Sequence, residues 1–557
     1  MKKSIPLKKL VIFLVLLLLV ITFSPALRFR ALGNRNPLPA SFSKGVFHVH
    51  SAFSDGKGDL EEITAAAAAE KLDFVVLTDH GRPNLEAASA TRSANGVTVI
   101  GGSELSLEGG HLAAGGFSVP TYRYPPEPQE AIDEVSRDRG ISFISHPFYG
   151  AIPWTDWSVK DFTGIELINA HTSASRPRFG RLVLVPRFFF RPKFALLTTL
   201  EYPKVSVAAW EELNRTGRYS GVFALDAHSR VSVGFGRYVN LPNYSQMFAL
   251  LTVYVKHGEA LGEDAETVAA SVVASMRAGS FFNCIEAIAP ANGFDAVFES
   301  GSGERVEMGG VSTGHSGRLV IHLPFEFVTD VVVRRNGDMF REFPRNKEPN
   351  LVVPISDAGV YRVEIFARAS IFDDLPWIIS NPFFLDTAQA RREAPAPAVR
   401  EVLASGTDFF HVEADPSSMG ALVEAPNGEE QPGIAFRYAL PEEPVTRDYF
   451  AAMVNREARS FVGFDGLTLR VRSPERVRFW LMFRTENDGV ETWFRRSFAA
   501  DHEWSTVSIP FEEFRVHSGE VRSPDLEAIV STFISIDNQI AYPGASGMLS
   551  ISDFGLF

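Results

Sequence analysis

The sequence predicts a multidomain protein in which an α/β domain, built on a parallel sheet or a barrel, precedes two β-sandwich domains. At 557 residues the chain is too long for one compact core, since domains typically hold about 100–200 residues. Between about residues 44 and 287, short apolar runs alternate with helix-like segments, which is typical of α/β folds. From residue 288 onward, Val, Phe and Arg alternate between turn residues and little helical pattern remains, as in antiparallel sandwiches.

Residues 1–30 have the form of an export signal. Lysines precede the uncharged apolar stretch Leu10–Leu27, and no Asp or Glu occurs before Asp55. The stretch is short for a spanning helix, which needs about 20 residues, and long for the apolar core of a cleaved signal. Two outcomes therefore stay open, a signal peptide that is removed or an N-terminal anchor that holds the protein on the membrane. In both, the N-terminal lysines favour a periplasmic or extracellular position for the rest of the chain.

A polar linker, residues 31–43, leads into the α/β domain, residues 44–287. The first predicted strand, 45–50, places His48 and His50 on one face by the two-residue period. A helix is expected over 59–71, because Asp59 and Glu62 have capping-box spacing before an Ala-rich run. Further short apolar runs are typical of buried strands, at 73–77, 97–100, 141–144, 164–168 and 221–225.

The β-rich half divides into two predicted sandwich domains. Residues 288–386 contain alternating segments such as RLVIHLPFEF and GVYRVEIFARA, and residues 401–557 contain LTLRVRS, RVRFWLMFRT and TWFRRSF. Such alternation is expected of strands with one buried face. A linker rich in Pro, Ala and Arg, residues 387–400, separates the two domains.

Charge and cysteine content exclude some classes of function. Lys and Arg number 54 against 67 Asp and Glu, for a net charge of −13, so duplex DNA is not an expected partner. The single cysteine, Cys284, excludes an intrachain disulfide. A lone Cys is also more often an inert core residue than a nucleophile.

Histidines and carboxylates gather at or just past the ends of the predicted barrel strands. They are His48, His50 and Asp55, Asp79 and His80, Glu104 and His111, His146, and Asp226 with His228. Sheets and barrels of the α/β class place their active sites at the carboxyl ends of strands. Imidazole and carboxylate together are the ligand set of Zn, Mn and Fe sites. The sequence therefore predicts a metal centre at this end of the domain.

These residues resemble the PHP (polymerase and histidinol phosphatase) superfamily of metal-dependent hydrolases. The motifs FHVHSAFSDGKG, FVVLTDHG, GSELS, ISHPF and LDAHS follow the order of the family from residue 45 to about 230. The resemblance implies a distorted (β/α)7 barrel, similar to a TIM barrel, with two or three divalent metal ions, usually Mn, Zn or Fe. It implies one metal on His48, His50, Glu104 and Asp226, a second on Glu104, His111 and His146, and a third on Asp55, His80 and His228.

The same resemblance implies a mechanism without a protein nucleophile. A hydroxide that bridges two cations is available at neutral pH, because metals lower the pKa of bound water from about 15.7 towards 7. Glu104 and Asp226 are the residues expected to position it. Arg82 is a candidate for holding a substrate anion in bidentate fashion, and His171 for contacting the substrate or protonating the leaving group; both are equally compatible with ordinary loop roles. Asp79 is expected to orient His80.

The leading functional prediction is an exported or membrane-anchored phosphoesterase that hydrolyses a phosphomonoester or phosphodiester. The whole chain also resembles the carbaryl-hydrolase (CehA/McbA) branch of the superfamily, which implies a carbamate, ester or amide substrate as the alternative for the same metal centre. The last domain is similar to carbohydrate-binding jelly rolls. A third hypothesis is therefore a catalytically inactive protein that binds glycans or the cell envelope, with exposed Trp and Tyr rings against sugars rather than in sandwich cores.

Overall fold

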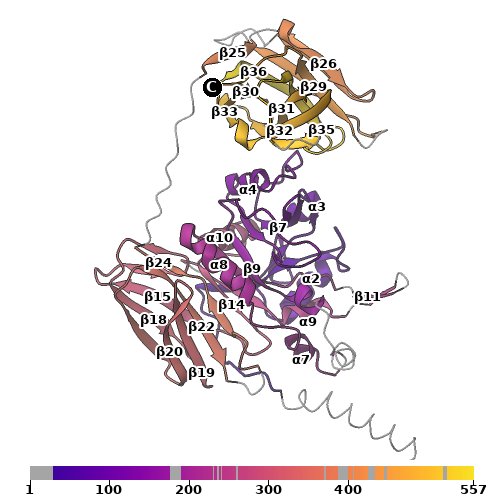
Figure 1. Ribbon diagram of the computed structural model, residues 1–557. Coiled ribbons are helices and arrows are strands. Elements are labelled where there is room, and N and C mark those ends of the chain that lie inside the picture. Colours follow the sequence, from indigo (N-terminus) through magenta and orange to yellow (C-terminus); the bar gives the residue numbers. More distant parts are fainter. Residues whose placement is uncertain are drawn as a thin grey trace, which may run out of the picture. The chain divides into compact units, whose positions relative to one another are not determined.

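The computed structural model describes residues 29–557 except for short internal segments. These segments are 176–187, 189, 230, 235–236, 240, 259–260, 369–371, 387–398, 405–406, 425–432, 445–447, 488 and 519–522. The predicted signal or anchor, residues 1–30, and the predicted linker, residues 387–400, lie outside the described residues except for the last two positions of each. Two compact units make up the chain, Met1–Val119 with Glu127–Ala390 and Pro120–Pro126 with Arg391–Phe557 (Figure 1). Within the described residues, no helix is long and apolar enough to cross a membrane.

The first unit contains a distorted α/β barrel whose strands belong to two sheets. One sheet includes β1 (Phe42–Val49), β2 (Phe74–Leu77), β4 (Arg92–Ala94), β5 (Val97–Ile100), β13 (Thr252–Lys256) and β14 (Phe281–Cys284). The other runs in the order β10 (Ser220–Ala224), β9 (Gly164–Asn169), β8 (Ile141–Ile144), β7 (Gly110–Gly115), β6 (Gly102–Leu107) and β3 (His80–Gly81). A short hairpin, β11 (Val231–Gly234) and β12 (Arg237–Val239), follows β10.

Helices lie around these strands in Figure 1. They are α2 (Leu60–Ala69), α3 (Leu85–Ala88), α4 (Pro128–Arg137), α5 (Ala170–Ser175), α7 (Pro192–Leu197), α8 (Lys204–Thr216), α9 (Tyr244–Phe248) and α10 (Ala265–Arg277). The helix predicted over 59–71 is α2. Its N-cap is Asp59, whose side chain accepts a hydrogen bond from the backbone N–H of Glu62 at 2.9 Å, which satisfies one of the free N–H groups at a helix start.

The direction of several strands departs from a regular barrel. Strands β1, β2 and β5 are parallel, and so are β8, β9 and β10. However, β7 is antiparallel to both of its neighbours, and β13 is antiparallel to β1. Apolar runs in the sequence indicate buried strands but not their direction, because a strand that is buried on both faces has the same apolar pattern whether it is parallel or antiparallel to its neighbours.

The barrel is closed by backbone hydrogen bonds between the two sheets. The chain after β10 pairs with the end of β1, where His50 N donates to Ala227 O at 3.0 Å and Leu225 N donates to Phe47 O at 3.1 Å. On the other side, Glu104 N donates to Thr78 O at 3.0 Å. The ends of β1, β2, β6 and β10 therefore meet, and polar side chains that follow these strands are brought together.

Two buried asparagines connect β10 to the other sheet deeper in the barrel. Asn283 of β14 accepts a hydrogen bond from Phe223 N at 2.7 Å and donates to Gly221 O at 2.8 Å. The side chain of Asn381 accepts from Gly221 N at 2.8 Å. These amides satisfy backbone groups that lack a neighbouring strand, as buried polar groups require.

The sheet of the barrel continues into the first sandwich. Strand β14 pairs with β23, so that a 12-stranded sheet spans both parts. Its sandwich strands are β17 (Val311–Ser312), β19 (Thr329–Arg335), β20 (Asp338–Asn346), β22 (Gly359–Ala367), β23 (Ile378–Ser380) and β24 (Phe383–Leu385). The opposing sheet has β15 (Asp295–Ser300), β16 (Arg305–Glu307), β18 (Gly317–His322) and β21 (Asn350–Ile355). The boundary predicted between residues 287 and 288 therefore falls inside one compact unit.

The second unit is a β-sandwich of two six-stranded sheets around one hydrophobic core. One sheet contains β25 (Glu401–Ala404), β27 (Met419–Glu424), β28 (Ile434–Ala439), β30 (Gly466–Arg472), β33 (Ser505–Pro510) and β36 (Ser546–Leu556). The other contains β26 (His411–Ala414), β29 (Phe450–Asn455), β31 (Val477–Asn487), β32 (Val490–Ala500), β34 (Arg515–Ser518) and β35 (Ile529–Asp537). The predicted fold class, an α/β barrel followed by two β-sandwiches, is confirmed.

Candidate metal centre

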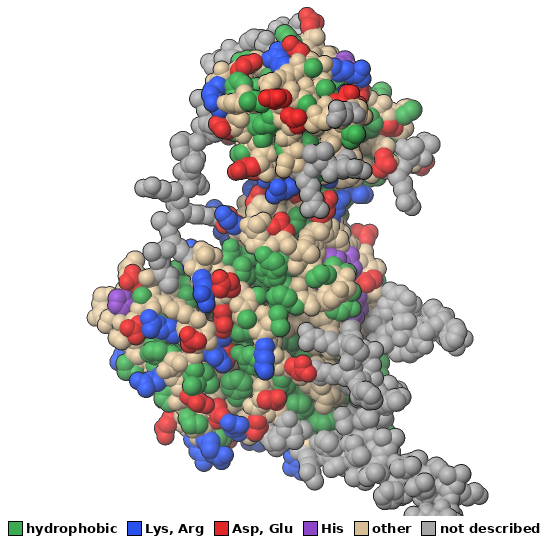
Figure 2. Space-filling model, viewed as in Figure 1, with side chains coloured by type: hydrophobic (Ala, Val, Ile, Leu, Met, Phe, Trp, Pro, Cys, Tyr) green, Lys and Arg blue, Asp and Glu red, His purple; other side chains and the backbone are tan. Residues whose placement is uncertain are grey.

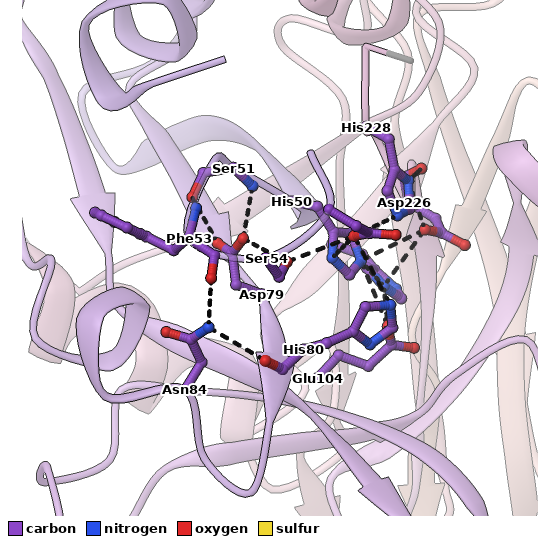
Figure 3. A network of polar contacts seen from close by, with 12 residues as sticks. His50, Ser51, Phe53, Ser54, Asp79, His80, Asn84, Glu104, Asp226 and His228 are labelled. Atoms are coloured by element: carbon purple, nitrogen blue, oxygen red, sulfur yellow. Dashed lines mark hydrogen bonds and ion pairs between the residues drawn. The ribbon is translucent and has the colours of Figure 1, made fainter. Parts of the chain in front are cut away.

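The predicted ligand side chains converge at the ends of the barrel strands. His48 is in β1 and His50 follows it, His80 begins β3, Glu104 is in β6, His111 is in β7, His146 follows β8, and Asp226 and His228 follow β10. Asp55 lies in the loop after β1. Figure 3 shows the side chains of His50, His80, Glu104, Asp226 and His228 turned towards one another. Residues from distant parts of the sequence thus form one cluster.

Glu104 occupies the centre of this cluster. Its Oε1 lies 3.1 Å from both His111 Nδ1 and His146 Nε2. Its Oε2 lies 3.4 Å from the Nε2 atoms of both His48 and His50. Although burial raises it, these imidazoles hold the pKa of the Glu104 carboxyl well below its ordinary value. His80 Nδ1 also lies 3.2 Å from Oε2. Each oxygen of this carboxylate therefore faces its own group of imidazoles, which is the geometry of a ligand that bridges two cations.

A second part of the cluster is formed by Asp55, Asp226 and His228 around His50. Asp55 Oδ1 lies 3.2 Å from His228 Nε2 and 3.5 Å from His50 Nδ1. Asp226 Oδ1 lies 3.3 Å from His228 Nδ1 and 3.5 Å from His50 Nε2. His50 therefore faces Asp55 with Nδ1, and both Asp226 and Glu104 with Nε2.

Several sets of described residues bring ligand atoms within 4.8 Å of one another. They are His50 with Asp55, His80 and His228; His48 with His50 and Asp226; His80 with Glu104 and His111; and His171 with Asp226 and His228. Buried nitrogen atoms add to this fit. Nδ1 of His146 has no hydrogen-bond partner within the described chain. Nδ1 of His50 and Nδ1 of His80 lie 3.5 Å from Asp55 Oδ1 and 3.2 Å from Glu104 Oε2, without the geometry of a hydrogen bond. Buried polar atoms are rarely left unpaired, so these nitrogens are suited to coordinate an ion.

The backbone is strained where it presents these ligands. His48, His146 and Asp226 have φ angles of 68°, 30° and 53°, in a region that non-glycine residues seldom adopt. Such strain persists where surrounding structure enforces it, and it is concentrated at functional sites. Three of the predicted ligands share this conformation, which other residues such as Lys71 and Asn95 also adopt.

Asp79 holds the loop that carries Asp55. It accepts hydrogen bonds from Ser51 N at 2.9 Å, Ser51 Oγ at 2.8 Å and Ser54 Oγ at 2.7 Å (Figure 3). We expected Asp79 to orient His80, and the contacts show that it instead orders the loop at 51–55. The serines of this loop were not singled out from the sequence, although their spacing between two ligands was visible there.

The two predicted substrate residues lie at the edge of the cluster. His171, in α5, is exposed, and its ring centroid is 5.1 Å from that of His228. Arg82 lies in the turn directly after β3 and is half-buried, outside the sets of residues able to hold metal. Arg82 follows His80 by two residues, and the side chain of His80 is 34% exposed. His171 brings a ring nitrogen within 4.8 Å of ligand atoms of Asp226 and His228. Histidine side chains also reach the surface of this unit in Figure 2.

Two residues of β9 that the sequence analysis missed contact the ligands. Glu166 and Asn169 are 1% and 5% exposed. Glu166 Oε1 lies 2.5 Å from His48 Nδ1, and Asn169 Nδ2 lies 3.2 Å from Asp226 Oδ2. Glu166 could have been found from the sequence, because it is a carboxylate inside the otherwise apolar run at 164–168. A Glu is almost never fully buried without a partner, so its position in a buried strand predicts such a partner.

Comparison with known proteins assigns part of this unit. Residues 47–168 match the family model of the PHP domain. The chain is similar to a two-domain protein of Bacteroides vulgatus that contains a predicted PHP-like metal-dependent phosphoesterase, with 14% identity over 64% of this chain and 98% of the other at a TM-score of 0.31. The family match alone assigns residues 47–168 to a PHP domain, and the buried His, Asp and Glu clusters are consistent with a site for several metal ions.

Other comparisons concern the β-rich half. The chain is similar to a family 11 carbohydrate-binding module of a Clostridium thermocellum cellulase, with 18% identity over 29% of this chain and 96% of that one at a TM-score of 0.24. A family 30 module of a cellulase from the same organism has 12% identity over 28% of this chain and 91% of that one, at a TM-score of 0.19. No curated protein gives a significant match.

Metal affinity is expected to rise with pH, because metal-free ligands carry protons. Burial lowers the pKa of His228, but Asp55 and Asp226 raise it to about 9. By contrast, burial and the charge of His228 lower the pKa of His50 to about 4. Below pH 9 a metal must therefore displace a proton from His228. Neighbouring carboxylates also raise the pKa of His48 and of His146 above its ordinary value, against the effect of burial. We expect the apparent association constant to rise at least about tenfold per pH unit between pH 6.5 and 8.5, as for one or more displaced protons.

This pH dependence is measured by titrating the metal-free protein with Mn²⁺ or Zn²⁺ against a fluorescent chelator at pH 6.5, 7.5 and 8.5. The His228→Gln variant lacks the titrating imidazole and should show a smaller slope. An affinity that is constant across this range would contradict the protonated state assigned to His228.

Proposed function

We propose that the PHP domain is a metal-dependent phosphoesterase that hydrolyses a phosphomonoester or phosphodiester. The observation that carries this proposal is the position of Glu104, whose two oxygens face two separate groups of imidazoles. Metal ions bound there would activate water as a nucleophile and neutralise charge that develops on phosphoryl oxygens.

The residues of the chain take distinct roles in this proposal. His48, His50 and Asp226 hold one cation beside Glu104, His111 and His146 hold the second, and Asp55, His80 and His228 offer a third position. Arg82 binds a substrate oxygen, since a guanidinium matches phosphate geometry. His171 gives a proton to the leaving oxygen, which its exposed position beside His228 supports.

A cavity beside the centre is suited to the alcohol part of the substrate. It has a volume of about 590 Å³ and is lined by His146, Tyr149, Asn169 and Thr172 among others. This volume is within the usual range for small-molecule sites, about 300–1,000 Å³. The cavity therefore favours an organic phosphoester over inorganic phosphate compounds.

The alternative is the hydrolysis of a carbamate, ester or amide, which the resemblance to the CehA/McbA branch implies. One observation favours it. Phe148, which lines the cavity, is 37% exposed and stacks on Trp157 with a centroid distance of 5.6 Å. An exposed aromatic pair at the rim would accept a flat apolar leaving group, which an aryl carbamate provides.

We also propose that the protein acts outside the inner membrane, exported by residues 1–30, which either are removed or remain as an anchor. The lysines before the apolar stretch Leu10–Leu27 support this orientation. A phosphoester or carbamate in the periplasm or the medium would then be the accessible substrate.

The second sandwich carries a cleft that supports glycan binding. The cleft has a volume of about 440 Å³ and is lined by residues of β26, β29, β31, β32, β34 and β35 with their loops. Trp493 and Phe533 form its aromatic wall, with ring centroids 4.7 Å apart. Asp448 and Asp537 add carboxylates beside this wall. Aromatic faces next to hydrogen-bonding groups are the chemistry that sugar rings require, so we propose a neutral oligosaccharide as its ligand.

The phosphoesterase proposal is tested with the full-length protein in mild detergent, stripped by a chelator and reconstituted with Mn²⁺ or Zn²⁺. We expect metal-dependent hydrolysis of p-nitrophenyl phosphate or its bis ester, lost in the double variant His48→Ala/His50→Ala. The matched control is His315→Ala/His322→Ala, which removes two exposed histidines of the first sandwich. Turnover of 1-naphthyl N-methylcarbamate alone would establish the alternative, and a metal-loaded protein inactive on all three would refute both.

A further inference from the structure

Strand β9 brings a buried carboxylate and a buried amide against ligands that come from three other strands. Glu166 lies in the middle of β9 and Asn169 ends it, and both side chains are buried. Among the His, Cys, Asp and Glu side chains of the described residues, Glu166 belongs to none of the sets able to hold metal. Their role must therefore be sought in their contacts with those residues.

Glu166 determines which nitrogen of His48 faces the centre. Its Oε1 lies 2.5 Å from His48 Nδ1, and both side chains are fully buried. A carboxylate can only accept, so Nδ1 carries a hydrogen and Nε2 is the nitrogen left to coordinate an ion. This Nε2 is the atom that lies 3.4 Å from Glu104 Oε2.

The second oxygen of Glu166 supports two further elements. Its Oε2 accepts hydrogen bonds from His146 N at 2.7 Å and from Asn169 Nδ2 at 2.9 Å. His146 has a φ angle of 30°, so this bond helps to hold a backbone conformation that is otherwise unfavourable. Three donors thus converge on the two oxygens of one side chain.

Asn169 extends the same contacts to the end of β10. Its Nδ2 lies 3.2 Å from Asp226 Oδ2, while its Oδ1 accepts a hydrogen bond from Thr172 N at 2.9 Å. The second bond holds the first turn of α5, the helix that carries His171. The side chain of Asn169 therefore connects the predicted ligand Asp226 to α5, the helix that carries the exposed His171.

We propose that Glu166 and Asn169 are positioning residues that align His48, His146 and Asp226 for metal binding. This inference rests on the proposed metal-dependent function and deepens it. A carboxylate is required at position 166, because a glutamine has a single acceptor oxygen. Its NH2 group would face either His48 Nδ1–H or the two N–H donors at the other oxygen.

The test measures metal binding by the full-length, metal-free protein, titrated with Co²⁺ and followed by its visible absorption. Loss of such supporting contacts typically lowers metal affinity about 10–100-fold. We expect a loss of this size and an altered Co²⁺ spectrum in Glu166→Gln, with partial recovery in Glu166→Asp, which restores the charge. The matched control is Glu364→Gln, which alters another fully buried carboxylate of the same unit, one that pairs with Arg334 and Arg362.

Each outcome decides the inference. Unchanged affinity and spectrum in Glu166→Gln, or an equal loss in Glu364→Gln, would overturn it. If Glu166→Gln does not fold, Asn169→Ala replaces it, and wild-type affinity in that variant would likewise overturn the inference. Since the readout is Co²⁺ binding, a protein that binds metal but hydrolyses no phosphoester would refute the proposed function and leave this inference standing.

Discussion

Replacing Glu104 by glutamine is expected to lower phosphoester turnover by about 10³-fold, the upper range for loss of one electrostatic group, and to reduce bound metal. The carboxylate faces five imidazoles through its two oxygens and is 1% exposed. An amide of the same size keeps one neutral oxygen and places an NH2 group against the imidazoles on the other side. Both the charge and the bridging geometry are then lost without a change in volume.

The Glu104→Gln effect is checked by elemental analysis of the reconstituted protein and by initial rates with p-nitrophenyl phosphate. Glu342→Gln, an exposed glutamate on β20 of the first sandwich, is the control for the loss of one negative charge. Full metal content together with wild-type rates in Glu104→Gln would exclude this residue as a bridging ligand.

The grouping of the candidate ligands could be predicted because it depends on local patterns. His48 and His50 share a strand face through the two-residue period, and the remaining ligands follow apolar runs that end at the same edge of the barrel. The geometry around them confirms that these side chains lie together. Their assignment to individual ions stays a prediction.

Other features depend on contacts between residues that are far apart in the sequence. The sequence predicts that Glu166 lies in a strand. Its contacts with His48 and His146 follow only from the position of β9 between β8 and β10. The pairing of β14 with β23, nearly one hundred positions later, joins the barrel to the first sandwich. No periodicity within either strand encodes that pairing, because register and partner are set by burial in the folded chain.

Removing the aromatic wall of the second sandwich is expected to weaken glycan binding strongly. Trp493 is half-buried in the cleft, packs against Phe533 and lies under Arg484, whose guanidinium is 5.5 Å from the ring centroid. A central aromatic residue of a binding site commonly contributes about 2 kcal/mol, equal to a roughly thirtyfold loss of affinity. Trp493→Ala should therefore lose about this much affinity for cello- or chito-oligosaccharides.

A matched tryptophan distinguishes a binding role from a structural one. Trp504 is also half-buried and lies under Arg470 at 5.5 Å, but it precedes β33 of the opposite sheet and does not line the cleft. By calorimetry on the full-length protein, Trp504→Ala should keep wild-type affinity. Equal losses in both variants would indicate general destabilisation, and wild-type affinity in Trp493→Ala would exclude the cleft as the site.

If the glycan site is independent of the metal centre, Glu104→Gln should bind the same oligosaccharides as tightly as the wild type, because the two sites are built from different compact units.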